Sequence, residues 1–196
     1  GEWFGAQYFG FTPDVMTLAK GITSGYIPLG AAMFNDRIAK VLKEQGGELA
    51  HGCTYSGHPV CTAVALENIR ILEEERIVER ARDDIAPYLA QRWAELGEHP
   101  LVGEARIAGM VGALELVPRK GERAFFEERG NVGVLCRDNA LKNGLILRAT
   151  YDSMLLSPPL ILSRDQVDEL FEKAWKSLNE TAAALFTADV DVARTK

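Results

Sequence analysis

A single lysine at the end of a short apolar run constrains this chain more than any other feature. The run Val15–Ala19 suits a buried strand, and it delivers Lys20 into a loop that contains Gly21 and Gly25. Glycines at these positions let the backbone come close to a ligand. An amine shielded from water is disfavoured as an ammonium ion, and the neutral amine can attack a carbonyl. The alternative is a solvated lysine after a core strand.

A second notable segment is His-Gly-Cys-Thr-Tyr-Ser-Gly-His-Pro at residues 51–59. Its hydroxyl side chains, Thr54 among them, can donate to an anion. Pro59 suits the first turn of a helix, so the sequence predicts a helix that begins here. The free N–H groups and the dipole at such a helix start favour a phosphate. The same composition is also typical of an ordinary turn.

Arg148 is the third candidate. It follows the apolar run 145–147 and opens a polar bend that reaches Ser153, before a second apolar run at 154–156. A guanidinium at a bend can hold a carboxylate through two parallel hydrogen bonds. The alternative is a strand-end arginine in a surface salt bridge.

These segments resemble class III (omega-type) aminotransferases, which are fold type I enzymes that use pyridoxal phosphate. The matching pieces are PDVMTLAKGITSGYIPLGA (13–31), HGCTYSGHP (51–59) and LRATYDSMLLSPPLILSRDQVDEL (147–170), in the family's order. The resemblance extends from residue 1 to about residue 186. It implies an α/β fold that forms the C-terminal part of a fold type I transferase: the end of the large-domain sheet, a long connecting helix and a small α+β domain.

The resemblance also implies a role for each candidate residue. Lys20 holds the cofactor aldehyde as a Schiff base and moves the proton between substrate and cofactor, while Arg148 binds the substrate carboxylate. Thr54 contacts the cofactor phosphate of the neighbouring subunit, with Cys53 beside it in the cofactor site, and Tyr26 lines the substrate pocket. The family therefore implies a homodimer, or a dimer of dimers, with sites at the interface.

The expected reaction is transfer of an amino group from a primary amine, an omega-amino acid or a diamine, to a keto acid such as pyruvate. Omega-amino acid–pyruvate and putrescine aminotransferases are the most similar members. Decarboxylation or intramolecular amine transfer by the same family stays open. So does a catalytically incomplete fragment that acts only as a folding or dimerisation module.

The chain is expected to divide into residues 1–97, the end of the cofactor-binding domain with the connecting helix, and residues 98–186, a small α/β domain. Residues 187–196 are expected to form a frayed tail. The start of the chain matches a position well inside the family's longer sequence. The family's phosphate loop, the aromatic side chain that stacks on the cofactor ring and the carboxylate that pairs with the ring nitrogen would precede it.

Composition narrows the class of partner. A net charge of −6 over 196 residues argues against a nucleic-acid or anionic-membrane surface. No apolar run is long enough to span a bilayer, and nothing resembles a signal peptide. The three cysteines are predicted to be reduced thiols of a cytoplasmic protein, and no cysteine or histidine set has the spacing of a metal site.

Overall fold

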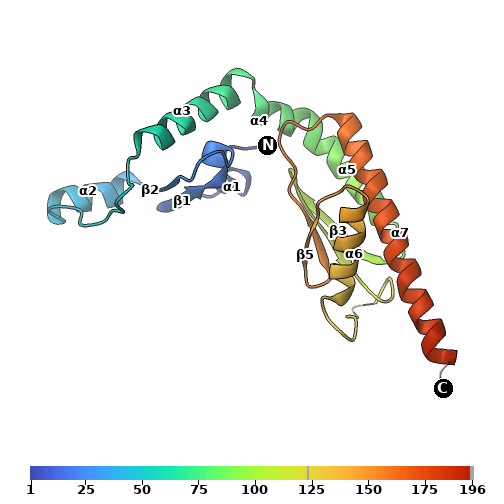
Figure 1. Cartoon of the computed structure of the whole chain (residues 1–196). Coiled ribbons are helices and arrows are strands. Elements are labelled where there is room, and N and C mark those ends of the chain that lie inside the picture. The colour runs from blue at the N-terminus through green and yellow to red at the C-terminus, as the bar shows by residue number, and fades with distance from the viewer. Residues whose placement is uncertain (123, 195–196) are drawn as a thin grey trace. The chain divides into compact units, whose positions relative to one another are not determined.

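The computed structural model describes residues 1–122 and 124–194, and it is mixed α/β (Figure 1). It divides into two compact units, which we call the N-terminal unit (residues 2–79) and the C-terminal unit (residues 80–196 with Gly1). The sequence placed the boundary after residue 97. The division instead falls after residue 79, because helix α5 (Ala86–Leu96) packs on strand β3 (Val102–Ala108) of the C-terminal unit.

The N-terminal unit is built around a two-stranded antiparallel sheet. Strands β1 and β2 pair from Val15 opposite Phe34 to Ala19 opposite Gly30, so the strand expected at Val15–Ala19 is confirmed, although its residues are exposed or half-buried rather than buried. The elements of this unit are α1 (Gly5–Tyr8), β1 (Val15–Ala19), the 3-10 turn η1 (Lys20–Thr23), β2 (Gly30–Phe34), α2 (Asp36–Gln45), α3 (Pro59–Glu74) and, at the boundary, α4 (Ile77–Arg80).

Short polar side chains set where the helices of this unit begin. The Asn35 side chain accepts a hydrogen bond from the Ile38 backbone N–H at 3.1 Å, and this caps α2. At α3, the His58 ring nitrogen Nδ1 accepts from the Val60 N–H at 3.2 Å, and Pro59 occupies the first turn, as predicted.

The long connecting helix expected after residue 60 is interrupted. Arg76 has φ +51°, a left-handed conformation that ends α3 at Glu74, and a new helix, α4, starts at Ile77. A π-helical segment, η2 (Ala81–Ile85), then leads into α5. Pro87 lies in the first turn of α5 and lacks the N–H that a continuous α-helix would use, so the helix changes its hydrogen-bonding pattern just before it.

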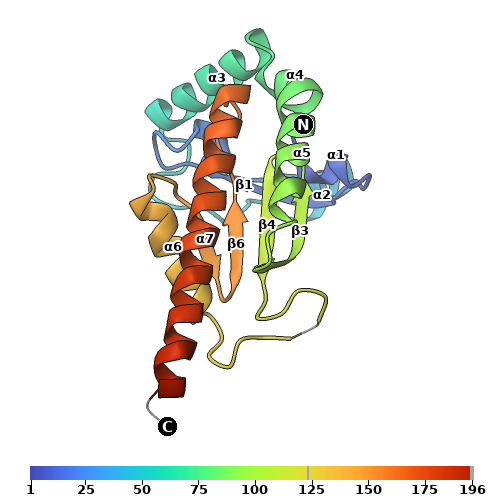
Figure 2. The ribbon, with the colours of Figure 1, turned by 90° about the vertical axis from the view of Figure 1, so that its right-hand side faces the viewer.

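The C-terminal unit is an antiparallel sheet covered on one face by helices. Its strands lie in the order β3-β4-β6-β5, and α5, α6 and α7 lie on the same side of them (Figures 1 and 2). The elements after β3 are β4 (Val111–Leu116), α6 (Asn131–Lys142), β5 (Arg148–Thr150), β6 (Ser153–Leu156) and α7 (Arg164–Arg194). The tail expected from residue 187 is helical as far as Arg194, and residues 195 and 196 lie outside the described residues.

Alternation along the strands places the core between sheet and helices. Leu114 and Met154 are directly paired and fully buried, and Val167 of α7 belongs to the same cluster. Trp93 fills the space over Gly112, where a β-carbon would stand 2.8 Å from its ring. Its indole N–H donates to the Arg106 carbonyl at 3.0 Å, so the ring is both packed and satisfied.

Candidate active site

The lysine turn directly follows β1. Lys20 is exposed, so the residues of this chain do not shield its amine from water, and in this respect it matches the alternative of a solvated lysine. Its φ of +54° is a left-handed conformation that costs a non-glycine residue about 1–2 kcal/mol. Ser24, at φ +49°, and Gly25, at φ +78°, are also left-handed. The chain can therefore reverse direction within a few residues and return as β2, which leaves the Lys20 side chain at the outer end of the strand.

Hydrogen bonds within the turn hold this reversal. The Gly25 N–H donates to the Lys20 carbonyl at 3.0 Å, and the Tyr26 N–H donates to the Thr23 carbonyl at 3.1 Å. The Thr23 hydroxyl, which is buried, donates to the Ile27 carbonyl at 2.7 Å. Backbone that is bonded in this way has few alternative conformations.

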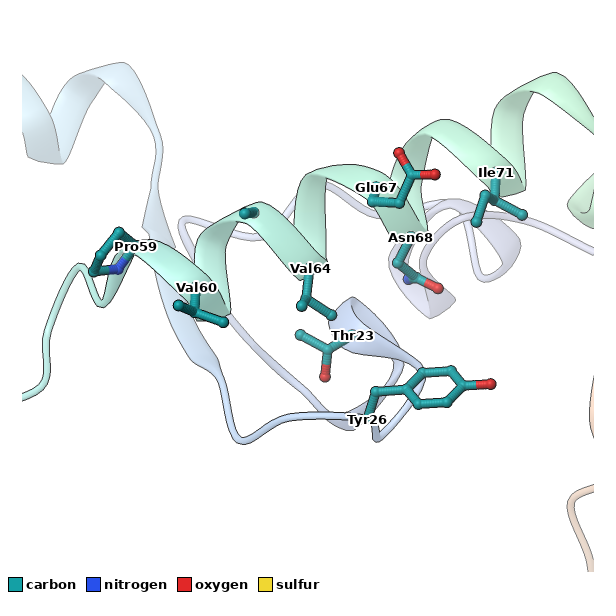
Figure 3. A pocket seen from close by; sticks show the side chains of 9 residues that line it. Thr23, Tyr26, Pro59, Val60, Val64, Glu67, Asn68 and Ile71 are labelled. Carbon is teal, nitrogen blue, oxygen red and sulfur yellow. The ribbon is translucent and has the colours of Figure 1, made fainter.

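A hollow of about 720 Å³ lies between this turn and helix α3 (Figure 3). Its walls are mostly apolar, and Thr23 from the turn lies opposite Val64 of the helix. Tyr26, predicted to line a pocket, does line this hollow, although 88% of its side chain is exposed in this chain. Small-molecule sites are commonly apolar hollows with a few polar groups at their edge.

One of those polar groups is a fixed anion. The Arg70 guanidinium donates to both carboxylate oxygens of Glu67, at 2.8 and 2.6 Å, one turn along α3. These hydrogen bonds hold the pKa of the Glu67 carboxyl below its ordinary value. Glu67 therefore remains charged at the edge of the hollow under neutral conditions.

Cys53 and Thr54 stand together on an exposed turn before α3. The Cys53 N–H donates to the Ser56 hydroxyl at 2.9 Å, and the Ser56 N–H donates back to the Cys53 carbonyl at 2.9 Å. The Thr54 hydroxyl has no hydrogen-bond partner among the described residues, so it is free to donate to a ligand. The His58 ring already satisfies one N–H of the helix start, which reduces what that start offers to a phosphate.

The sequence predicts a bend at Arg148, but in the structure this residue begins strand β5. It pairs with Leu155, whereas its neighbour Ala149 pairs with the buried Met154. Its side chain therefore lies on the face of the sheet that is turned away from the helices. No carboxylate of the described residues forms an ion pair with it, so the surface salt bridge considered as its alternative role is absent there. Arg148 belongs to the C-terminal unit, while the other four candidates belong to the N-terminal unit.

The hairpin that carries Arg148 is fastened at its turn. The Asp152 carboxylate, 4% exposed, accepts from the backbone N–H groups of Gly130 and Gly133 at 2.9 and 3.0 Å, at the start of α6. A carboxylate at a helix N-terminus also interacts favourably with the helix dipole. The sequence reasoning missed Asp152, because its partners lie about twenty residues away along the chain.

The remaining expectations concern the cysteines, metal binding and membrane spans. The three cysteines are free, as predicted, and burial raises the pKa of the Cys136 thiol to about 11. Among the described residues, no group of three or more histidine, cysteine, aspartate or glutamate side chains is arranged to hold a metal ion, and no helix is long and apolar enough to cross a membrane.

Comparison with known proteins identifies the class of enzyme to which this chain belongs. The sequence profile of the class-III aminotransferases matches residues 1–178. The chain belongs to the class-III aminotransferase family, whose members use pyridoxal phosphate. The fold expected from the resemblance, a part of a fold type I transferase, is confirmed by solved transaminase structures.

Three known proteins show which members of the family this chain is similar to. The chain is 58% identical over 185 residues to the putrescine–pyruvate aminotransferase of Pseudomonas aeruginosa, covering 94% of this chain and 40% of that protein. It is 35% identical over 184 residues to a mitochondrial gamma-aminobutyrate transaminase of Solanum lycopersicum, covering 92% and 36%. A variant of the thermostable omega transaminase PjTA-R6 matches with a TM-score of 0.88 at 37% identity, covering 93% and 41%. The chain thus spans about two-fifths of the length of these relatives.

The residues present fit the cofactor. Lys20 supplies an exposed amine on a hydrogen-bonded turn, and the Thr54 hydroxyl is an unused donor suited to a phosphate oxygen. Pyridoxal phosphate, when bound, supplies an aldehyde that accepts amines and a ring that stabilises negative charge on the substrate carbon. Lys20 would hold the cofactor of its own subunit, and Thr54, with Cys53 beside it, would contact the phosphate of the cofactor in a neighbouring subunit.

Proposed function

We propose that this chain is part of an enzyme that transfers an amino group from a primary amine, a diamine or an omega-amino acid, to a keto acid such as pyruvate. The observation that carries the proposal is the 58% identity to a putrescine–pyruvate aminotransferase across the segment that contains the lysine turn. The gamma-aminobutyrate transaminase among the relatives, whose named substrate is an omega-amino acid, supports the same donor class.

Each candidate residue has a physical reason for its role. The Lys20 amine both bonds to the cofactor and, once a substrate amine has displaced it, takes a proton from one carbon and returns it to another. Arg148, which forms no ion pair with a carboxylate of the described residues, binds the carboxylate of the keto acid through two hydrogen bonds. Tyr26 lines the wall of the substrate pocket, while Thr54 and Cys53 contact the phosphate end of the cofactor.

Assembly and location complete the proposal. We infer a homodimer, or a dimer of dimers, in which the Thr54 turn of one subunit contributes to the cofactor site of its neighbour. Exposed Thr54 and exposed apolar residues such as Leu66 of α3 support contacts of the N-terminal unit with further polypeptide. We place the enzyme in the cytoplasm, in keeping with its free cysteines.

The test is a substrate panel. The purified chain, loaded with pyridoxal phosphate, is given putrescine, gamma-aminobutyrate or a control alpha-amino acid, with pyruvate or 2-oxoglutarate as acceptor, and the amino-acid product is quantified. We expect putrescine with pyruvate to give the highest rate, Lys20→Ala to abolish it, and Arg148→Ala to raise the KM for the keto acid. Carbon dioxide release without amino transfer would favour the decarboxylase alternative, and no turnover with any pair would favour the incomplete fragment.

A further inference from the structure

We propose that Asn68 is a positioning residue for Lys20, and that its carboxamide fixes the turn from which the lysine side chain emerges. This inference rests on the proposed function, because it assigns Asn68 to the reactivity of the same amine. Asn68 lies on helix α3, 48 positions beyond Lys20, and lines the hollow beside the turn (Figure 3).

The carboxamide makes three hydrogen bonds to the turn. Its Nδ2 group donates to the Gly21 carbonyl at 3.0 Å and to the Ile22 carbonyl at 3.2 Å. Its Oδ1 atom accepts from the Ser24 hydroxyl at 2.6 Å. One side chain thus binds three of the four residues that follow Lys20, from a helix that is remote in sequence.

The turn needs an external fastening because its conformation is unfavourable by itself. Lys20 and Ser24 are both left-handed without being glycine, and such residues persist only where surrounding contacts hold them. The turn buries one side chain, Thr23, so packing alone does little to fix it. The Asn68 hydrogen bonds supply the constraint and thereby set the direction in which the Lys20 side chain leaves the backbone.

The chemistry of the contact requires an amide rather than a carboxylate. Two of the three partners are carbonyl oxygens, which need a donor, and the third is a hydroxyl, which can donate to an acceptor. Aspartate would keep the acceptor for Ser24 but would face the Gly21 and Ile22 carbonyls with negative oxygen. Asn68→Asp therefore preserves size and removes the two donor bonds, while Asn68→Ala removes all three.

The reactivity of Lys20 provides the test. The full chain is treated with pyridoxal phosphate and then with borohydride, which leaves a stable secondary amine on every lysine that has reacted. Peptide mapping then gives the reaction rate of each lysine. The measurement is repeated from pH 6 to pH 10, a range that extends from about neutral pH to roughly the ordinary pKa of lysine. In the unaltered chain, we expect Lys20 to react ahead of the helix lysines Lys40 and Lys43. We expect Asn68→Ala and Asn68→Asp to slow Lys20 by roughly tenfold or more and to shift its pH–rate profile.

Matched variants separate this role from general stability. Glu74→Gln, on the same helix and in contact with Arg70 rather than with the turn, should leave the Lys20 rate unchanged. Ser24→Ala, which removes one of the three bonds and leaves α3 unaltered, should slow Lys20 by about fivefold. It serves as the second measurement if the Asn68 variants do not fold.

Two results would overturn different claims. If Lys20 reacts selectively in the unaltered chain and equally fast, with the same pH profile, in the Asn68 or Ser24 variants, Asn68 has no positioning role and the proposed function stands. If the unaltered chain shows no preference for Lys20 over Lys40 and Lys43, the proposed function fails and this inference fails with it.

Discussion

The two units of this chain differ in how they hold their residues in place. In the C-terminal unit, Trp93, Leu114 and Met154 are almost wholly buried in one core between sheet and helices. In the N-terminal unit, Phe9, Phe11 and Tyr26 are exposed, and the lysine turn is held mainly by hydrogen bonds. Side-chain packing holds the C-terminal unit in place. Directional polar contacts hold the lysine turn of the N-terminal unit, which carries the proposed nucleophile.

The contrast between the two units would be contradicted most clearly if a mutation in the C-terminal core left that unit's stability unchanged. Trp93→Ala removes a buried ring and the hydrogen bonds of its indole N–H to the Arg106 and Ala113 carbonyls, and should cost about 3–5 kcal/mol of unfolding free energy. Thiol labelling reports the loss of stability in each unit separately. Cys136, which is buried and has its pKa raised to about 11, should react much faster in the variant, while exposed Cys53 should react as before. An unchanged Cys136 rate would contradict the packing argument.

Asp152 tests whether a polar fastening also matters inside the packed unit. Asp152→Ala leaves two N–H groups at the start of α6 without an acceptor and should cost about 2 kcal/mol. Asp152→Asn, which keeps one acceptor oxygen but no charge, should cost less. Urea denaturation followed by circular dichroism gives both values, and equal stability of all three proteins would count against the capping role.

Lys20 tests the opposite unit, where function and stability compete. Glycine adopts φ +54° without strain, so Lys20→Gly should make the N-terminal unit about 1 kcal/mol more stable than Lys20→Ala, which has lost the amine but kept the β-carbon. Hydrogen exchange at the Gly25 N–H, bonded to the residue-20 carbonyl, reports the difference. Faster exchange in the glycine variant would show that the left-handed conformation is not strained.

The smallest expected effect is a pH dependence of the C-terminal unit. His99 accepts from the Leu101 N–H through Nδ1, its Nε2 lies 3.1 Å from Asn179 Oδ1, and burial lowers the pKa of its imidazole. The unfolded chain therefore binds a proton near pH 6.5 that the folded chain takes up only at lower pH, so stability falls as pH drops below about 6.5. We expect a loss of about 1 kcal/mol or less between pH 7.5 and 5.5, values either side of that ordinary pKa. The His99→Gln variant should not show this loss of stability between the two pH values, as measured by urea denaturation of both proteins.

Local signals in the sequence predicted most of the elements. The strand before Lys20 and the helix from Pro59 follow from a hydrophobic run and from proline placement. The start of α7 carries a further local signal, a capping box in which the Ser163 hydroxyl accepts from the Gln166 N–H and the Gln166 side chain accepts from the Ser163 N–H. These patterns act over a few residues, so a single sequence reveals them.

Long-range and backbone-specific features escaped prediction. The left-handed Arg76 that ends α3 has no local signature, since arginine is an ordinary helix residue. The register that makes Arg148 the first residue of β5 depends on pairing with Leu155 rather than on the apolar run before it. The contact of Asn68 with the lysine turn joins segments more than forty residues apart, and an asparagine on a helix does not by itself indicate a partner.

The two backbone bonds to the Asp152 side chain have a mechanical consequence for the proposed acceptor site. They couple the tip of the β5–β6 hairpin to the first turn of α6, so hairpin and helix should move as one piece. Arg148 lies four residues before Asp152 on that piece. A shift of α6 would therefore carry the guanidinium with it, and a carboxylate held by Arg148 would in turn bias where the helix rests.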